Sequence, residues 1–440
     1  MSSGDSKVRL MQKNIEIVSP AGNLEKMIFA VKYGADNVYF GSDQFNLRVK
    51  AGNFSYDDIK DGIDYCKKNN VKTTFLMNSF LHESDVDSVI EYAQKIKELQ
   101  FDSVMISDPG MLMILKQVGI DADFHLSTQM STLNSYAAKF WIEAGFKRIV
   151  LAREATIDEI KNIKKNTGAE IEVFVHGALC IAYSGRCLLS RYMQSGDANS
   201  GDCTQPCRWK YSLMEEKREG DYFPIVEHDK GTEILSSKDL MLIERLEEYI
   251  DAGVDAFKIE GRMKSLYYTA NTTRIYKHAL RKSGTEEFKK FLPFWLEELD
   301  LINHRPYTTD LFNEFSEKGY DGIPYIKNAL FIGYREDDAR RGGILPPAPA
   351  HTDPTHTKDK NDASNEIILK TLNPIYQNEI LEAIYPIKDE IIDSKYRVLK
   401  IFFEDKEIEM GRPNMTYRIL FDKPVFKDAI FRRRLNGIKP

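Results

Sequence analysis

Residues 15–41, IEIVSPAGNLEKMIFAVKYGADNVYFG, contain the repeat that predicts the fold. An apolar, β-branched run (Ile15–Val18) precedes an amphipathic stretch (Leu24–Tyr33), and a second apolar run (Asn37–Gly41) follows. The runs have the composition of strands and the middle stretch has helical periodicity, so the segment is predicted as one β-α-β unit. Repeated units of this kind build a parallel sheet.

The same unit recurs along the first two-thirds of the chain. The predicted strands are Ile15–Val18, Asn37–Gly41, Thr73–Asn78, Ser103–Ser107, Asp123–Ser127, Arg148–Leu151, Ile171–Val175 and Ala256–Glu260. The predicted helices include Leu24–Tyr33, Tyr56–Lys68, Ser84–Leu99, Ser135–Ala144, Ile157–Lys165 and, after the last strand, about Tyr268–Arg281. Eight strands alternating with helices predict an α/β fold, a (β/α)8 TIM barrel. A doubly wound open sheet is the alternative, but Ser19–Gly22 is not its Gly-rich phosphate loop.

Composition divides the chain further. The predicted parts are a flexible N-terminus (1–13), the barrel (14–285) with a cysteine-bearing insertion after strand seven (177–238), a helical and loop extension (286–345), a Pro-rich linker (346–364) and a small β domain (365–440). Strand-like runs in the β domain are Glu366–Leu369, Arg397–Phe403 and Thr416–Leu420. The insertion is expected to end at a helix near Asp239, and insertions of this length are usually functional.

The overall composition predicts a soluble, cytoplasmic protein. Of 440 residues, 42% are hydrophobic and 29% are charged, and the net charge is −6. The first residues, MSSGDSKVRLMQKN, contain no apolar segment of the kind found in a secretory signal. No apolar run reaches the roughly 18 residues of a membrane span, so no membrane contact is expected. In a reducing compartment, clustered cysteines point to metal binding or catalysis.

Four of the five cysteines lie in the insertion. Cys180, Cys187, Cys203 and Cys207 are separated by six, fifteen and three residues. Thiolates favour zinc, copper(I) or iron–sulfur clusters, and the spacing leaves zinc and iron–sulfur equally open. Cys180 follows strand seven, at the barrel end where TIM enzymes keep their active sites, which weakens the alternative of a structural zinc staple. Cys66 has helical spacing to apolar neighbours and is predicted as a core residue.

Polar residues that follow the predicted strands are the candidate site residues. Arg48, Arg153 and Arg262, from three separate units, could converge on an anionic substrate, and Asn78 is a further substrate-binding candidate. The alternative for two of these arginines is a local ion pair, Arg153 with Glu154 and Arg262 with Glu260.

Three residues form the predicted catalytic set: His176, Arg153 and Glu260. His176 lies four residues before Cys180, and a histidine titrates in the range needed for acid–base catalysis. A histidine that only bonds to the backbone near the metal is the equally weighted alternative. The sequence lacks a Gly-x-Ser-x-Gly elbow and a His-Glu-x-x-His motif, so it offers no conventional peptidase machinery.

Several motifs together resemble peptidase family U32. The main ones are EVFVHGALCIAYSGRCLLS (172–190) and GDCTQPCR (201–208), supported by VSPAG (18–22), NLR (46–48), SDPG (107–110), SKDL (237–240) and KIEGRMKS (258–265). The resemblance spans roughly residues 14–334, and the C-terminal strands are similar to the small β domain of many members. In length and motifs the chain looks most like the prephenate-dependent tRNA uridine hydroxylases of this family.

The resemblance implies a [4Fe–4S] cluster on the four cysteines, prephenate as co-substrate and hydroxyl source, and tRNA as the partner hydroxylated at C5 of a wobble uridine. A U32-type collagenase-like peptidase, a hydroxylase of another substrate such as rRNA, and a non-catalytic assembly factor remain alternatives. The dicarboxylate prephenate suits converging arginines. RNA backbone contacts would fall to basic residues such as Arg208, Lys210, Arg262, Lys264 or Arg432–Arg434, although that last run is interpreted as a solvated tail.

Overall fold

The computed structural model describes residues 15–47, 54–180, 182, 184, 186–194, 197–204, 206, 238–309, 325–336, 363–387 and 391–435, together with four short strands between 213 and 233. The chain forms two compact units. The first comprises residues 1–31, 35–296 and 304–326, and the second comprises 32–34, 297–303 and 327–440. Among the described helices, none combines the length and apolar character needed to cross a bilayer.

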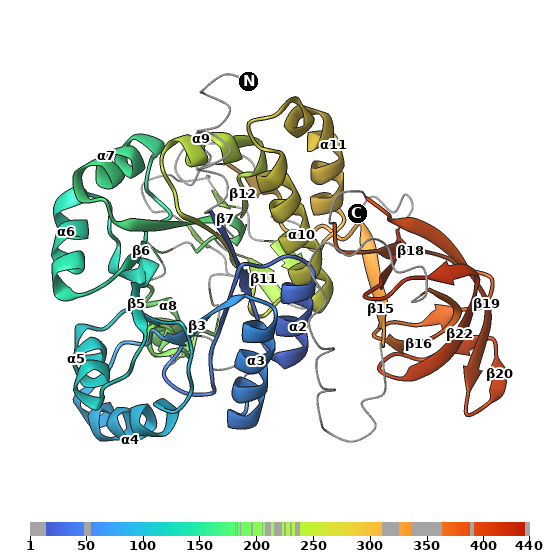
Figure 1. The fold of residues 1–440 in the computed structure, drawn as a ribbon, viewed down its shortest axis with the longest axis horizontal. Coiled ribbons are helices and arrows are strands. Elements are labelled where there is room, and N and C mark those ends of the chain that lie inside the picture. The colour runs from blue at the N-terminus through green and yellow to red at the C-terminus, as the bar shows by residue number, and fades with distance from the viewer. Residues whose placement is uncertain are drawn as a thin grey trace. The chain divides into compact units, whose positions relative to one another are not determined.

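The first unit is a closed barrel of eight parallel strands surrounded by helices (Figure 1). Its strands are β1 (Glu16–Pro20), β2 (Asn37–Phe40), β3 (Lys72–Met77), β4 (Ser103–Ile106), β5 (Asp123–Leu126), β6 (Arg148–Val150), β7 (Glu170–Ala178) and β13 (Ala256–Ile259). They pair in chain order, and β13 closes the barrel by pairing with both β1 and β7. The predicted (β/α)8 barrel is therefore confirmed.

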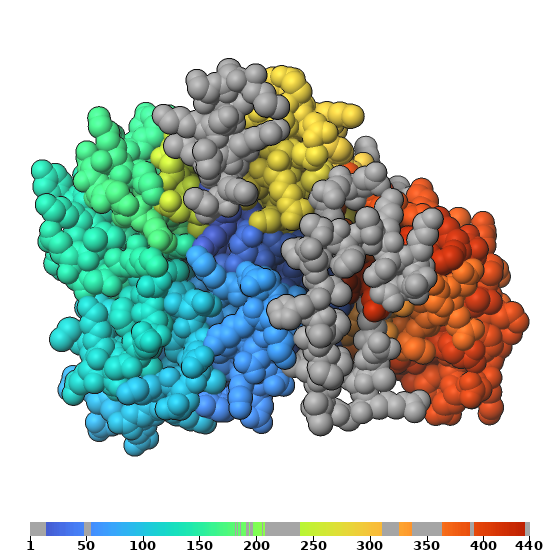
Figure 2. Space-filling model, viewed as in Figure 1, coloured from blue at the N-terminus to red at the C-terminus, as the bar shows by residue number. Residues whose placement is uncertain are grey.

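The surrounding helices are α2 (Leu24–Lys32), α3 (Tyr56–Lys68), α4 (Val86–Ile96), α5 (Pro109–Val118), α6 (Ser135–Ala144), α7 (Ile157–Thr167), α9 (Leu246–Asp251) and α10 (Leu266–Lys282). Local chemistry sets their ends. Ser55 and Thr156 form capping boxes that start α3 and α7, and Gly145 ends α6 in the left-handed conformation. The atoms of α4 to α7 form a continuous outer surface (Figure 2).

The cysteine-bearing insertion begins on an extended strand. β7 continues three residues beyond its predicted end, and its last residues pair antiparallel with β12 (Asp239–Met241), which pairs in turn with β14 (Tyr307–Thr308). The prediction of a helix near Asp239 is therefore wrong, because that segment forms strand β12. Gly177, with φ of 106°, permits the close packing: a Cβ there would lie 2.5 Å from the carbonyl oxygen of Glu260.

The insertion holds a short helix, α8 (Leu189–Gln194), and two small antiparallel pairs. One pair joins β8 (Leu213–Met214) to β9 (Tyr222–Phe223), and the other joins β10 (Val226–His228) to β11 (Gly231–Glu233).

Charged side chains are paired inside the barrel. Lys258 on β13 and Glu172 on β7 are 3% and 1% exposed, and Nζ lies 2.7 Å from Oε1. Arg148 on β6 contacts Glu16 on β1 at 2.7 Å and Glu170 on β7 at 3.0 Å. Strands β1 and β6 are not neighbours, so the contact between them crosses the barrel interior. The buried charges of Lys258, Glu172 and Arg148 are tolerated because each has an opposite charge within hydrogen-bonding distance.

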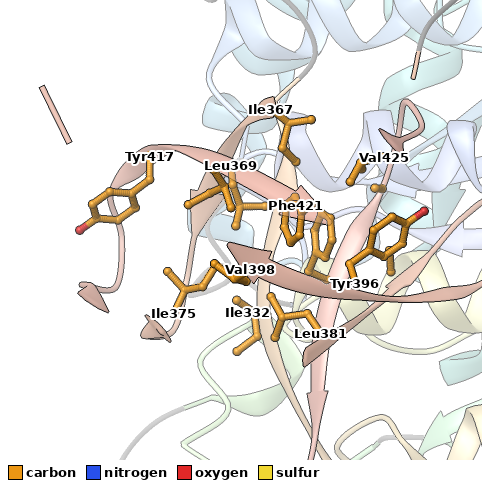
Figure 3. Packing of buried hydrophobic residues seen from close by; sticks show 14 of the residues in the cluster. Ile332, Ile367, Leu369, Ile375, Leu381, Tyr396, Val398, Tyr417, Phe421 and Val425 are labelled. Carbon is orange, nitrogen blue, oxygen red and sulfur yellow. The ribbon is translucent and has the colours of Figure 1, made fainter. Parts of the chain in front are cut away.

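The second unit contains an antiparallel sheet of seven strands that curls so that β18 also pairs with β19. Its strands are β15 (Ala329–Arg335), β16 (Ser364–Thr371), β18 (Ile380–Ile384), β19 (Ser394–Phe403), β20 (Lys406–Ile408), β22 (Thr416–Val425) and β23 (Ile430–Arg434), and β17 (Ile375–Tyr376) pairs separately with β21 (Met410–Gly411). Figure 3 shows its apolar core, which includes Ile332, Leu369 and Phe421.

The predicted start of the β domain at residue 365 misses β15. This strand falls within the predicted extension 286–345, yet it pairs with β16 and β23. The same predicted extension contains a helix, α11 (Glu286–Asp300), and β14 of the barrel unit. Residues 286–345 thus supply parts of both units, which their mixed composition did not indicate.

The basic run Arg432–Arg434 is not a solvated tail but the end of β23. Arg432 is buried, and its guanidinium contacts Glu382 at 2.9 Å and Glu298, in the same unit, at 2.6 Å. Arg433 and Arg434 also pair with glutamates. Glu382 lies on the paired strand β18, whereas Glu297 and Glu298 lie on α11. The charges of the arginines are therefore neutralised within the protein.

We expect Arg432→Ala to lower the free energy of unfolding of the second unit by about 3–5 kcal/mol, because two glutamates lose a buried partner. Urea denaturation followed by circular dichroism measures this. Arg418→Ala is the matched control: Arg418 pairs with Glu366 on the surface, so its loss should cost about 1 kcal/mol or less. Equal effects of the two substitutions would contradict the assignment of Arg432 to the interior.

Candidate active site at the barrel rim

Polar side chains follow β3, β4 and β5 and meet at the carboxyl end of the barrel. Asn78 Nδ2 donates to Ser127 Oγ over 3.5 Å, and Ser107 Oγ donates to Gln129 Oε1 over 2.7 Å. All four residues are buried. Because parallel strands end at one rim, residues far apart in sequence form one polar surface, at the place where barrel enzymes hold substrates.

The cysteine-bearing segment is bound to this rim at several points. The backbone N–H and hydroxyl of Ser184 both donate to the carboxylate of Glu154, at 2.8 and 2.5 Å, and Glu154 follows β6. The N–H of Phe80, after β3, donates to the carbonyl of Asn199 over 3.1 Å. A segment that starts at β7 therefore lies against the ends of β3 and β6.

Three of the predicted ligand cysteines are described, and they influence one another. Burial and the neighbouring Cys180 and Cys203 raise the pKa of the Cys187 thiol. The N–H of Leu189 lies 3.4 Å from Cys187 Sγ, and the hydroxyl of Ser190 lies 3.8 Å from Cys203 Sγ. A bound cation would offset the unfavourable charge of a Cys187 thiolate, so this sulfur suits a thiophilic metal.

The fourth predicted ligand, Cys207, lies outside the described residues. Within the described part of the chain, no three His, Cys, Asp or Glu side chains are grouped closely enough to hold a metal ion. The four-cysteine centre therefore stays a prediction. Cys66, by contrast, is fully buried in α3, as expected of a core residue.

Two of the predicted catalytic residues contact each other. Arg153 Nη2 lies 3.5 Å from Glu260 Oε2, and its guanidinium lies over the ring of Phe174, 4.1 Å from the centroid. The alternative pairing of Arg153 with Glu154 is wrong, because Glu154 binds Ser184. Among the described residues, the stacked guanidinium makes a single long hydrogen bond, and its other N–H groups can serve a ligand.

The structure describes one of the other two predicted arginines, Arg262. Arg262 Nη1 donates to Asn46 Oδ1 over 2.9 Å, and Asn46 Nδ2 donates to the carbonyl of Ser42 over 2.5 Å. Arg262 thus holds the loop after β2 through Asn46. Arg48 lies outside the described residues.

His176 is enclosed by aromatic rings and is 1% exposed. Its ring centroid lies 5.4 to 5.8 Å from those of Tyr268, Tyr276 and Tyr307, and Nδ1 lies 3.4 Å from the hydroxyl of Tyr276. Burial, partly offset by the charge of Asp239, lowers its pKa to about 3. The imidazole is neutral near pH 7, so this environment disfavours the predicted acid–base role and favours a packing role.

The buried pair of Lys258 and Glu172 was not among the predicted residues. A signal was present, since Glu170 and Glu172 occupy alternate positions of an otherwise apolar strand. Alternation places both side chains on the same face of the strand. The sequence does not show whether that face points into the barrel, because this is decided when the sheet closes.

A model of peptidase family U32 matches residues 22–321. This span is more than half of the 440-residue chain. The chain belongs to peptidase family U32.

Several U32 relatives have names that state an activity. tRNA hydroxylation protein P1 of Bacillus subtilis (strain 168) is 39% identical, with 75% of this chain and 80% of that protein covered. tRNA hydroxylation protein P of Escherichia coli (strain K12) is 34% identical, with 70% and 77% covered. Collagenase of Porphyromonas gingivalis (strain ATCC BAA-308 / W83) is 33% identical, with 67% and 72% covered. These names divide between RNA modification and proteolysis.

We expect His176→Gln to flatten the loss of stability in acid. The pKa of His176 falls from 6.5 to about 3 on folding, so below pH 6.5 the unfolded chain binds the extra proton and stability is lost as the pH falls. Urea unfolding should show the wild type losing about 2 kcal/mol more than the variant between pH 7 and pH 5. The titratable groups around His176, namely Asp239, Lys264 and His304, are present in both proteins. Identical pH dependence would mean an ordinary pKa and would restore the acid–base role.

We expect Cys187→Ser, purified without oxygen, to lose bound metal, because a hydroxyl is a poor ligand for soft metals. Iron and sulfide analysis with a visible spectrum would measure about four irons per wild-type chain if the metal is a cubane cluster. Cys66→Ser is the matched control and should keep the metal. Zinc without sulfide in the wild type would contradict the iron–sulfur prediction.

Proposed function

We propose that this U32 protein is an RNA-modifying enzyme that hydroxylates tRNA, by prephenate-dependent 5-hydroxylation of a wobble uridine. The observation that carries the proposal is the attachment of the cysteine-bearing segment to the rim, through Ser184 and Glu154 and through Phe80 and Asn199. A metal held by that segment would adjoin the barrel mouth. The U32 relatives of B. subtilis and E. coli named for tRNA hydroxylation support RNA as the substrate.

We assign the cofactor as a [4Fe–4S] cluster held by Cys180, Cys187, Cys203 and Cys207. The cluster would supply a redox-active or Lewis-acidic centre beside the substrate. The protein's part is to position the sulfurs. Ser190 contributes doubly, because its hydroxyl lies near Cys203 Sγ and also accepts the N–H of Thr204 over 3.2 Å.

Arg153 is the proposed carboxylate-binding residue for prephenate. The face of Phe174 and the carboxylate of Glu260 orient its guanidinium, and the whole Arg153 side chain is 9% exposed. A guanidinium oriented in advance loses little entropy when it binds a carboxylate through two N–H groups. Glu260 therefore acts in this proposal by positioning Arg153.

The target base has to leave its RNA stack to enter the mouth, as in other enzymes that modify bases. Of the basic residues predicted to contact RNA, Arg208 and Lys210 lie outside the described part of the chain. Lys264 lies 3.7 Å from Asp239, and Arg432–Arg434 are neutralised by glutamates. We therefore assign the RNA backbone contacts to the insertion rather than to β23.

Peptidase activity is the second candidate function, because the P. gingivalis relative is named a collagenase. The rim hydroxyls give it little support. Ser127 accepts from Asn78, Ser107 donates to Gln129, and Thr128 donates to the carbonyl of Leu151 over 2.9 Å. Within the described ranges, none of these three hydroxyls is hydrogen-bonded to a histidine, which would activate a nucleophile for proteolysis.

Loss of the gene should remove 5-hydroxyuridine and its derivatives from tRNA in a strain without a paralogue. Nucleoside digestion and mass spectrometry measure this. Wild type restores the modification, whereas Cys187→Ser and Arg153→Met should restore less than about a tenth, since a charged hydrogen bond is worth roughly 1.5–3 kcal/mol. Arg418→Ala is the control.

The purified holo-protein should also hydroxylate tRNA when prephenate is added. Unchanged nucleosides in the deletion strain would exclude tRNA hydroxylation. Inactivity of the holo-protein on tRNA, with modification lost in vivo, would favour an assembly role, and hydroxylation of rRNA alone would reassign the substrate. Gelatin cleavage that survives cluster loss would favour the peptidase.

A further inference from the structure

Within the described part of the chain, Asn78 and Gln129 each keep one buried polar atom without a hydrogen-bond partner. These atoms are Asn78 Oδ1 and Gln129 Nε2, on side chains that are 7% and 2% exposed. Burying a polar group without a hydrogen-bond partner is unfavourable, so its retention calls for a reason. Two such atoms at the rim, where substrates bind in barrel enzymes, indicate that a ligand satisfies them.

The surrounding contacts hold both amides in one sector of the rim. Asn78 reaches from β3 past β4 to Ser127, and Gln129 lies two residues further along, in the turn Thr128–Met130. The hydroxyl of Thr128 anchors that turn to the carbonyl of Leu151 over 2.9 Å. Ser107, from the strand between them, fixes the other end of the Gln129 amide. The two unsatisfied atoms therefore belong to one pre-organised surface.

The two atoms differ in kind, and this restricts the ligand. Asn78 Oδ1 accepts hydrogen bonds, whereas Gln129 Nε2 donates them. A carboxylate or phosphate only accepts, so it would leave Asn78 unsatisfied and be repelled by its oxygen. The ligand must present a donor beside an acceptor, as a hydroxyl group or an N–H next to a carbonyl does. Uracil has this arrangement on its Watson–Crick edge, where N3–H lies between two carbonyl groups.

We propose that Asn78 and Gln129 read the imide edge of the target uracil, with Asn78 Oδ1 accepting from N3–H and Gln129 Nε2 donating to a neighbouring carbonyl. This inference rests on the proposed function and names the residues that recognise its base. It also gives the two substrates separate binding residues, since the base binds the two neutral amides and the carboxylate of prephenate binds Arg153.

The same arrangement would orient the ring for modification. With N3–H and a neighbouring carbonyl held, the C5–C6 edge points away from the two amides. The cysteine-bearing segment reaches this sector through Arg186, whose Nη2 lies 3.4 Å from Met130 Sδ and whose guanidinium lies 5.3 Å from the ring centroid of Phe80. Cys187 is the next residue. The reading pair and the proposed metal segment thus adjoin the same part of the mouth.

The test compares anticodon stem-loops that carry either uridine or 3-methyluridine at the target position, with the anaerobic holo-protein and prephenate. Methylation replaces the N3–H donor by a methyl group and leaves both carbonyl groups and the C5–C6 edge in place. For the wild type, kcat/KM should fall at least ~100-fold with 3-methyluridine, because a site built for a hydrogen bond strongly rejects a ligand that lacks it. In Asn78→Ala the difference in kcat/KM between the two RNAs should shrink below ~10-fold, because the acceptor Asn78 Oδ1 is gone.

Gln129→Glu replaces the donor by an acceptor of the same shape and should lower kcat/KM for uridine at least ~100-fold. Gln117→Glu, the same change at an exposed position of α5, should leave it unchanged. The uridine to 3-methyluridine ratio is measured within one preparation, so partial misfolding does not alter it. An active wild type that accepts both RNAs equally would overturn the reading pair and leave the proposed function intact. A wild type inactive on every RNA would overturn both.

Discussion

The pairing of β7 with β13 is the constraint on which the rest of the structure depends. It closes the sheet, and closure brings the carboxyl ends of eight strands to one rim. It also places Lys258 beside Glu172 in the interior, where neither charge would be tolerated alone. The paired charges and the closed sheet are thus mutually dependent. Without closure, Lys258 and Glu172 would not share a buried interior. Without each other, either buried charge would make closure unfavourable.

Strand β7 connects this framework to the proposed chemistry. It pairs with β6 and β13 within the barrel and, beyond the barrel, with β12. Its end therefore has a fixed direction, and the cysteine-bearing segment starts from a rigid point. Contacts with Glu154, after the neighbouring strand β6, and with Phe80, after the more distant strand β3, then hold that segment along the rim. A metal centre in the insertion would be positioned by strand pairing as well as by its own ligands.

Long-range packing changed the interpretation of several residues. His176 has the residue type and position of an acid–base catalyst, but three tyrosines enclose it and burial keeps it neutral. Arg153 and Arg262 both follow barrel strands, yet one contacts Glu260 while the other holds Asn46. Sequence proximity suggested different partners for both arginines, because it carries no information about which strand ends meet after closure.

The sequence by itself determined the strand–helix repeats, their number and the U32 motifs, because alternation, helical periodicity and capping act over a few residues. Only the tertiary structure decided which charges pair inside the barrel, that β15 belongs with the C-terminal strands, and which rim amides keep an unsatisfied atom among the described residues. Those outcomes depend on burial and on contacts between residues distant in sequence. Such contacts form only when the barrel closes, or when the C-terminal sheet assembles, and the groups are removed from water.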